Sequence, residues 1–117
     1  MRSTNPEVLM IIRCLKKKSK ETGGALWTVL AKKFEKSKHK RVSVNLSRIN
    51  RYTNENEKVV VPGKVLGAGI LEHKIFIAAF SFSKEARRKI EEVGGECLTI
   101  PRIVEKYPTN SGIKIIE

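Results

Sequence analysis

The chain has 117 residues, of which 40% are hydrophobic and 31% are charged. This length suits one domain, because a separate core usually needs roughly 100 residues or more, and the apolar content argues against global disorder. Lysine and arginine total 24 against 12 acidic residues, which gives a net charge of +12 at pH 7. Such an excess favours a polyanionic partner, above all nucleic acid.

The first element in chain order is an amphipathic helix over residues 6–20. Asn5 before Pro6 is typical of a helix start, and the apolar residues from Val8 to Leu15 recur at helical spacing. The opposite side of this helix gathers basic residues, which makes it a candidate surface for binding anions. These basic residues are Arg13, Lys16, Lys17 and Lys20.

A second helix is predicted over "ALWTVLAKKF", residues 25–34, because its large apolar residues lie on one arc. The short turn at Gly23 and Gly24 favours antiparallel packing against the first helix. We therefore place Trp27 in the core. Aromatic residues make up only 6% of the chain and are not interleaved with the basic residues, so stacking recognition of unpaired bases is disfavoured.

The segment from residue 36 to residue 54 is the leading candidate contact surface. It contains no carboxylate, so nothing local neutralises its cations. Its basic residues are Lys36, Lys38, Lys40, Arg41, Arg48 and Arg51, and His39 lies among them as a further phosphate contact. Most charge runs are solvated faces, but here the first 52 residues carry fourteen Lys and Arg against three Glu, whereas the other 65 carry ten against nine. This concentration favours nucleic-acid binding.

Within this segment, the alternation in "VSVN", residues 42–45, predicts a short strand. Asn45 is placed to cap a short helix over residues 46–52, in which Leu46 and Ile49 face inward. The outward side of that helix carries Arg48, Arg51 and Tyr52. We therefore expect this helix to extend the basic surface.

Beyond residue 52 the pattern alternates between strands and helices. Strands are predicted over residues 58–61, 74–82, 96–100 and 113–116, and helices over residues 84–93 and 102–107. The continuous hydrophobicity from Ile75 to Phe80 is typical of a strand covered on both faces, and Ser83 is a helix-cap signal. We expect an α/β fold in one compact domain over residues 1–117. Residues 1–52 form its helical, strongly basic half, and residues 53–117 form its α/β core, a small sheet with interleaved helices.

The residue inventory argues against an enzyme. All 12 acidic residues are glutamate, which excludes catalytic arrangements that need aspartate. His39 and His73 are isolated, and we interpret His73 as a solvated loop residue. Cys14 and Cys97 are far apart in the sequence and are interpreted as reduced packing thiols. We expect no catalytic residue, metal, cofactor or small-molecule substrate.

The glycine-rich segment over residues 62–69 does not make a nucleotide site. Lys58 and Val65 stand where a phosphate loop needs a glycine and a Ser or Thr. Two interpretations stay open. The glycines serve turns and close packing, or a bare backbone lies along a sugar-phosphate strand beside Lys64. Lys64 is therefore a secondary candidate for RNA binding.

Several of these segments together resemble one family. The specific strings are "VNLSRINRY" and "VVVPGKVLG", and "TNP", "GGALW", "AAFSFS", "IPRIVEKYP" and "GIKIIE" agree with them. On these strings the chain is similar to the archaeal and eukaryotic large-ribosomal-subunit proteins of the eighteen-e family, relatives of the universal protein fifteen of that subunit. Its short length resembles an archaeal member.

The resemblance implies a structural, non-enzymatic component of the large ribosomal subunit that binds large-subunit ribosomal RNA and adjoins other ribosomal proteins. The RNA-facing positions that it implies are Arg41, Arg48, Arg51 and Lys64, with Lys36, Lys38 and Lys40 beside them.

The chain has no apolar run of about 18 residues and no secretion signal, so we expect a cytoplasmic protein without a membrane partner. The alternative is a free RNA- or DNA-binding protein, such as a chaperone or a chromatin protein.

Overall fold

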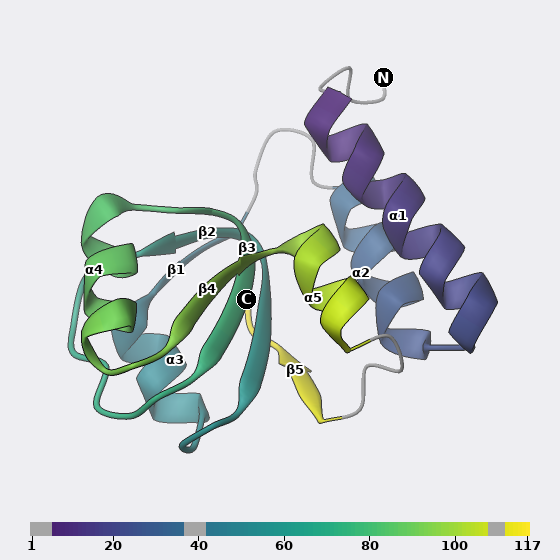
Figure 1. Cartoon of the computed structure of the whole chain (residues 1–117). Coiled ribbons are helices and arrows are strands. Elements are labelled where there is room, and N and C mark those ends of the chain that lie inside the picture. The colour runs from purple at the N-terminus through teal and green to yellow at the C-terminus, as the bar shows by residue number, and fades with distance from the viewer. Residues whose placement is uncertain (1–5, 37–41, 108–111) are drawn as a thin grey trace. The chain divides into compact units, whose positions relative to one another are not determined.

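The computed structural model describes residues 6–36, 42–107 and 112–117, without the side chains of Lys36 and Val42. This part of the chain folds into helices and a parallel sheet, which confirms the predicted α/β fold (Figure 1). The chain divides into two compact units. Unit 1 comprises Met1–Arg41 and Ile100–Ser111, and unit 2 comprises Val42–Thr99 and Gly112–Glu117. The boundary between these units differs from the division by charge at Tyr52, and the single domain over residues 1–117 stays a prediction.

In its described residues, unit 1 consists of helices that bury their apolar sides. They are α1 (Pro6–Thr22), α2 (Ala25–Lys36) and α5 (Ile100–Lys106). Helices α1 and α2 run antiparallel across the turn at Gly23 and Gly24, as predicted (Figure 1). Trp27 and Phe34 of α2 are almost completely buried, which confirms the core position of Trp27. The predicted cap at Asn5 lies outside the described residues.

Unit 2 holds the sheet. Its described elements, in chain order, are β1 (Val42–Asn45), α3 (Leu46–Tyr52), β2 (Lys58–Leu66), β3 (Phe76–Phe82), α4 (Lys84–Glu92), β4 (Glu96–Thr99) and β5 (Ile113–Ile115). The strands are parallel and follow the order β1-β2-β3-β4, and β5 also pairs with β2. Because β3 occupies one edge of β2, strands β1 and β5 share the other edge. There β5 pairs with residues 58–60 and β1 with residues 63–66.

The core of unit 2 lies between the sheet and two helices. Val59 of β2 and Ile77 of β3 belong to one buried cluster with Ile49 of α3 and Ile90 of α4. Side chains alternate between the faces of a strand, so Ala78 points to the opposite face of β3. Ala78 is also buried, which confirms that this strand is covered on both faces.

One predicted feature at a helix end is confirmed, and two are wrong. The Ser83 hydroxyl accepts a hydrogen bond from the Ala86 N–H at 3.1 Å, so Ser83 caps α4 as predicted. Asn45 occupies the cap position of α3, but its side chain makes no capping hydrogen bond. The predicted strand end at Ile100 is wrong, because Ile100 begins α5. Pro101 then stands in the first turn of that helix, where its missing N–H costs no hydrogen bond.

The glycine-rich segment is used for close packing. Gly63 lies inside β2, and a Cβ added at Gly67 would lie 2.8 Å from a backbone nitrogen of α4. Gly69 has φ of +92°, and a Cβ there would lie 2.9 Å from backbone atoms of Ser47 in α3. The Lys89 ammonium donates hydrogen bonds to the carbonyl oxygens of Gly67 and Gly69, at 2.7 and 2.8 Å. These contacts favour the folding interpretation of the glycines over a backbone laid against RNA.

The two cysteines are free thiols, in agreement with their interpretation as packing residues. Cys97 of β4 is partly buried and packs against the cluster of unit 2. Burial raises the pKa of the Cys97 thiol to about 11, an effect that Arg87 opposes and that Glu91 and Glu96 reinforce. The thiolate form of Cys97 is therefore almost absent at neutral pH.

The packing at Gly69 predicts a large effect of a single methyl group. Gly69→Ala combines a strained φ with a steric clash. It should lower the free energy of unfolding by about 1–3 kcal/mol more than a strained φ alone would. Gly23→Ala is the matched control, because Gly23 has φ of +73° but no atom within 4 Å of an added Cβ. Urea unfolding of the two variants measures the difference. Equal costs would contradict the close packing against Ser47.

The raised pKa of Cys97 predicts slow alkylation. At pH 9 the thiolate fraction of Cys97 in the folded protein should be lower than in the unfolded chain by a factor on the order of fifty. The rate of reaction with iodoacetamide, followed by mass spectrometry in a Cys14→Ser background with and without urea, measures this. The thiol form stabilises the fold below the ordinary pKa of 9.0, and that contribution is lost as the pH rises towards about 11. Similar rates in the two states would show that burial does not protect the thiol.

Candidate nucleic-acid interface

The first candidate surface is the solvent side of α1. Arg13, Lys16, Lys17 and Lys20 are all exposed. On the opposite side Val8, Ile11 and Leu15 are buried and Ile12 is partly buried, although Leu9 and Met10 of the same helix are exposed. The predicted separation of a core side and a cationic side is therefore confirmed. Since helical residues three or four positions apart are neighbours, the four cations form one continuous surface.

Most of these cations keep their charge unneutralised. The Lys16 ammonium lies 2.6 Å from the Glu35 carboxylate of α2, so Lys16 is paired. Within residues 6–36, 42–107 and 112–117, Arg13, Lys17 and Lys20 have no carboxylate partner. An unpaired cation on a rigid helix is available to a phosphate without first breaking an ion pair.

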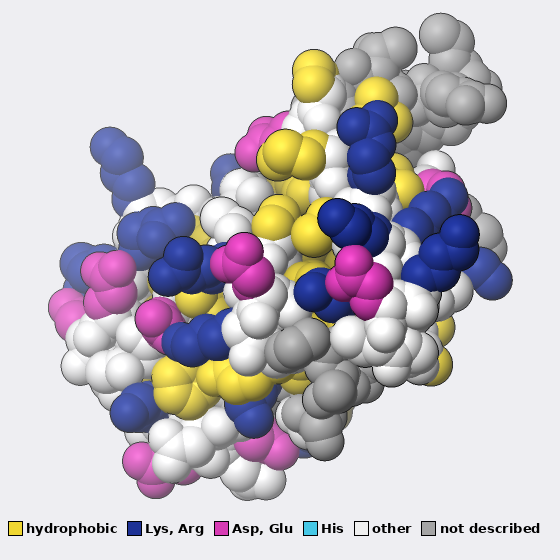
Figure 2. Space-filling model, turned by 45° about the vertical axis from the view of Figure 1, so that its right-hand side comes forward, with side chains coloured by type: hydrophobic (Ala, Val, Ile, Leu, Met, Phe, Trp, Pro, Cys, Tyr) yellow, Lys and Arg dark blue, Asp and Glu magenta, His cyan; other side chains and the backbone are white. Residues whose placement is uncertain are grey.

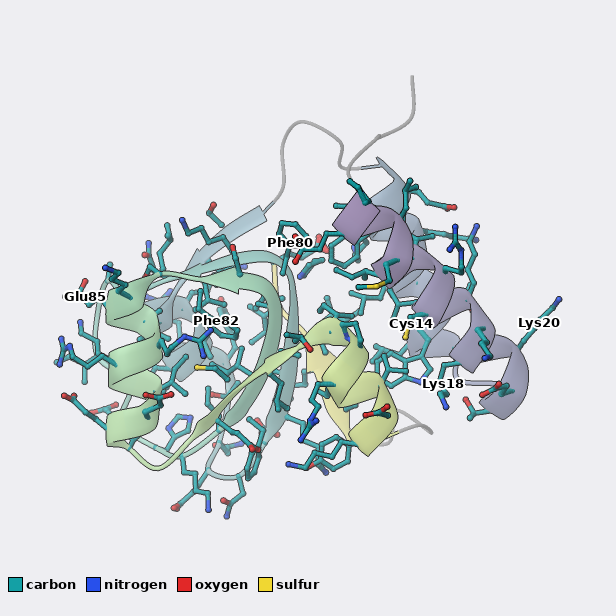
Figure 3. The ribbon with its side chains drawn as sticks, turned by 45° about the horizontal axis from the view of Figure 1, so that its top comes forward. Cys14, Lys18, Lys20, Phe80, Phe82 and Glu85 are labelled. Carbon is teal, nitrogen blue, oxygen red and sulfur yellow. The ribbon has the colours of Figure 1, made fainter. Side chains whose placement is uncertain are left out.

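The cations of α1 line an open groove of about 760 Å³, which we call the α1 groove. Its lining residues are Arg13, Lys16, Lys17, Ser19, Lys20 and Thr28. No acidic residue lines it, and the hydroxyl groups of Ser19 and Thr28 are hydrogen-bonded to each other. Figure 3 shows the Lys20 side chain extending away from the end of α1. The α1 groove therefore combines cations with hydroxyl groups, the chemistry that binds phosphate oxygens.

The second candidate surface is the outer side of α3. Arg48, Arg51 and Tyr52 are exposed there, as predicted from their spacing. The guanidinium carbon of Arg48 lies 5.2 Å from the centre of the Tyr52 ring, a cation–π contact. Arg51 makes no ion pair with a described residue. The two arginines and the tyrosine thus form one exposed group.

A third basic residue reaches this surface from the other end of the chain. The Lys114 ammonium of β5 donates a hydrogen bond to the Tyr52 carbonyl oxygen at 3.1 Å and lies 3.0 Å from the Glu57 carboxylate. Lys114 was not predicted from the sequence, because its position depends on the pairing of β5 with β2 and leaves no local signal. The resulting groove, of about 530 Å³, is called the α3 groove. It is lined by Arg48, Tyr52, Lys114, Ile115, Ile116 and Glu117.

Glu57 partly neutralises the cations of the α3 groove. A hydrogen bond from the Asn54 N–H, at 2.7 Å, is the main cause that lowers the pKa of Glu57, and the contact with Lys114 lowers it further. Glu57 is therefore ionised at neutral pH. The α3 groove is in consequence less positive than the α1 groove.

Of the remaining predicted site residues, only Lys64 has a described side chain, and it is not gathered with these two groups. Lys64 is exposed on β2, between Ser43 and Ser81 in the sheet register, and lines neither groove. Lys36 ends α2, and its side chain is not described. Lys38, His39, Lys40 and Arg41 lie outside the described residues. The proposed role of all these residues stays a prediction.

Two of the cations of α4, Arg88 and Lys89, have acidic neighbours on their own helix. Arg88 lies 2.8 Å from Glu92 and 3.9 Å from Glu85, both on the same helix. The face drawn in Figure 2 likewise shows carboxylates among the Lys and Arg side chains in several places. A dense set of basic residues is therefore not by itself an anion site. The unpaired cations of α1 are the better candidates for binding an anion.

His73 does not fit its interpretation as a solvated loop residue. It is partly buried, and its Nε2 atom lies 2.7 Å from the hydroxyl of Thr53, which is buried. His73 thus helps to join the loop before β3 to the end of α3. Among the described residues no group of three or more His, Cys and acidic side chains is arranged to hold a metal ion.

In the described part of the chain, every helix is too short or too polar to cross a membrane.

Comparison with known proteins supports the resemblance seen in the sequence. Residues 1–117 match the family model described as "Ribosomal protein 60S L18 and 50S L18e". The large ribosomal subunit protein eL18 of Methanothermobacter thermautotrophicus is 51% identical, over 97% of this chain and 94% of the relative. The eL18 proteins of Pyrobaculum aerophilum and Methanococcus maripaludis are each 44% identical, over 97% of this chain and 93% and 95% of the relatives. Because the match to the family model spans the whole chain, this protein belongs to the family of ribosomal proteins 60S L18 and 50S L18e.

Proposed function

We propose that the protein is a structural constituent of the large ribosomal subunit and binds folded large-subunit ribosomal RNA through its cationic surfaces. Membership of the family supports the place in the ribosome. The α1 groove is the observation that carries the RNA-binding part, because its lining contains four cations and no acidic residue. The role is structural, and it requires no cofactor.

Binding follows from counterion release. RNA phosphates hold condensed cations, and Lys and Arg side chains displace them when they approach the backbone. Arg13, Lys17 and Lys20 are suited to this, since no described carboxylate competes for them. A surface of this kind recognises the shape and the phosphates of folded RNA more than its base sequence.

The basic segment over residues 36–54 belongs to the same proposal. Residues 36–54 contain no carboxylate, so their cations add to the positive surface without local neutralisation. The proposed RNA-binding residues of this region are Lys36, Lys38, His39, Lys40, Arg41, Arg48 and Arg51, and Lys64 of β2 is a secondary contact. Neighbouring ribosomal proteins are the other expected partners.

Reversal of charge in the α1 groove tests the proposal. Lys17→Glu with Lys20→Glu should weaken binding to extracted large-subunit rRNA at least tenfold and lower the slope of log affinity against log salt by about two. If the wild-type protein contacts about six phosphates, its own affinity should fall about a thousandfold between roughly 50 and 200 mM salt. Fluorescence anisotropy measures both effects.

The matched control carries the same charge change on α4. Lys84→Glu with Arg88→Glu alters two exposed residues that lie outside both grooves, and should leave rRNA binding within about threefold of the wild type. Thermal unfolding verifies that both variants are folded. In a sucrose gradient, the α1 variant should leave the large-subunit fraction after a moderate salt wash and the control should stay. Equal retention of both variants, or equal affinity of the wild type for duplex DNA and rRNA, would overturn the proposal.

A further inference from the structure

We infer that the α3 groove binds a single unstacked base of the RNA, stacked on the Arg48–Tyr52 pair, with an adjacent phosphate on Arg51. The inference rests on the proposed function and adds a ligand to one surface of it. It also differs from the expectation that stacking on unpaired bases is disfavoured because aromatic residues are few and not interleaved with the basic residues: Tyr52 directly follows Arg51.

The pair offers a flat, accessible surface. Tyr52 is 51% exposed although it is a large aromatic residue, and Arg48 is exposed as well. The guanidinium carbon lies 5.2 Å from the ring centre, so the charged group already stands over the ring. Unstacked RNA bases are commonly bound on aromatic rings and on arginine planes. Arg48 and Tyr52 present both kinds of surface in one stacked pair.

The groove around the pair has an apolar floor and polar edges. Ile116 is buried and Ile115 is partly buried, so the floor supplies apolar contact for the faces of a base. The Lys114 ammonium has three N–H donors, and two are used by the Tyr52 carbonyl oxygen and by Glu57. One donor is left to bind an acceptor on the edge of a base.

The stacking pair is held in place before a ligand arrives. The Nε atom of Arg48 donates a hydrogen bond to a main-chain oxygen of Glu117 at 3.1 Å, and the ring of Tyr52 lies under the guanidinium. Lys114 fixes the backbone of Tyr52 from the neighbouring strand. A group that is already ordered loses little conformational entropy on binding, which favours a weak ligand such as one base.

Charge distinguishes the ligands of the two grooves. Glu117 lines the α3 groove and Glu57 is paired with Lys114 there, whereas no acid lines the α1 groove, where Glu35 is paired with Lys16 alone. A duplex backbone, with its high density of phosphates, is better suited to the α1 groove. An uncharged base suits the α3 groove, and Arg51, three residues after Arg48 on the same helix side, is placed for one phosphate.

A pair of RNA hairpins tests the inference with the full-length protein. One hairpin has a fully paired stem, and the other carries one bulged 2-aminopurine in the same stem. The wild type should bind the bulged hairpin at least about fivefold more tightly, the lower end of the effect of stacking one base on an aromatic residue. The fluorescence of 2-aminopurine should fall on binding, because stacking on a ring quenches it.

Substitutions of Tyr52 separate stacking from general affinity. Tyr52→Leu should abolish the preference for the bulged hairpin and the quenching, while its affinity for the paired hairpin stays unchanged. Tyr52→Phe keeps the ring and should keep both. Lys17→Glu with Lys20→Glu should weaken binding to both hairpins by the same factor and leave the preference intact.

Three outcomes would overturn the inference. A wild type that binds both hairpins equally, with the usual salt dependence, removes the base site and leaves the proposed function standing; the α3 groove would then be assigned to a protein neighbour. Loss of affinity for both hairpins in Tyr52→Leu shows that Tyr52 acts on the duplex and not on a base. A wild type that binds neither hairpin nor rRNA at low salt removes the proposed function and the inference together.

Discussion

The pairing of strands around β2 determines the arrangement of unit 2. Among the described strands, β3 takes one edge of β2, and β1 and β5 divide the other edge between them. Because β5 is parallel to β2 and adjoins residues 58–60, residues near the end of the chain come to lie beside α3. Lys114 then reaches both Glu57 and the carbonyl oxygen of Tyr52. The partners in these two contacts are 57 and 62 residues apart in the sequence. The α3 groove is thus a direct consequence of pairing between strands that are distant in the chain.

The molecule uses its basic residues in two ways. On α4, Arg88 is paired with glutamates of the same helix, and Lys89 donates to the carbonyl oxygens that hold the glycine-rich segment in place. On α1, Arg13, Lys17 and Lys20 have no carboxylate partner among the described residues. The same residue types therefore stabilise the fold in one helix and form an open cationic surface in another. The total charge of +12 does not distinguish these uses, because the pairing of each cation decides between them.

Local features of the fold were predictable where a short stretch of sequence contains the whole interaction. The helices that became α1 and α2 follow from apolar spacing, and Ser83 caps α4 through a hydrogen bond only three residues away. Predictions were wrong where a tertiary contact decided the outcome. His73 is bonded to Thr53, twenty residues earlier in the chain, which no local pattern indicates. The Asn45 side chain makes no capping bond, and the Ser47 N–H in the first turn of α3 donates instead to the Ala68 carbonyl oxygen at 3.1 Å.

The sequence by itself determined the α/β class, the cationic side of α1, the outward position of Arg48, Arg51 and Tyr52, and the family. These properties depend on spacing along a helix or strand and on motifs that are contiguous in the chain. Tertiary structure alone decided that Lys114 and Glu57 join the α3 surface, that Lys16 is paired while Lys17 and Lys20 are not, and that the glycines near residue 67 serve packing against helices. Each of these depends on atoms brought together from distant parts of the sequence, where the separation along the chain carries no information about the distance in space.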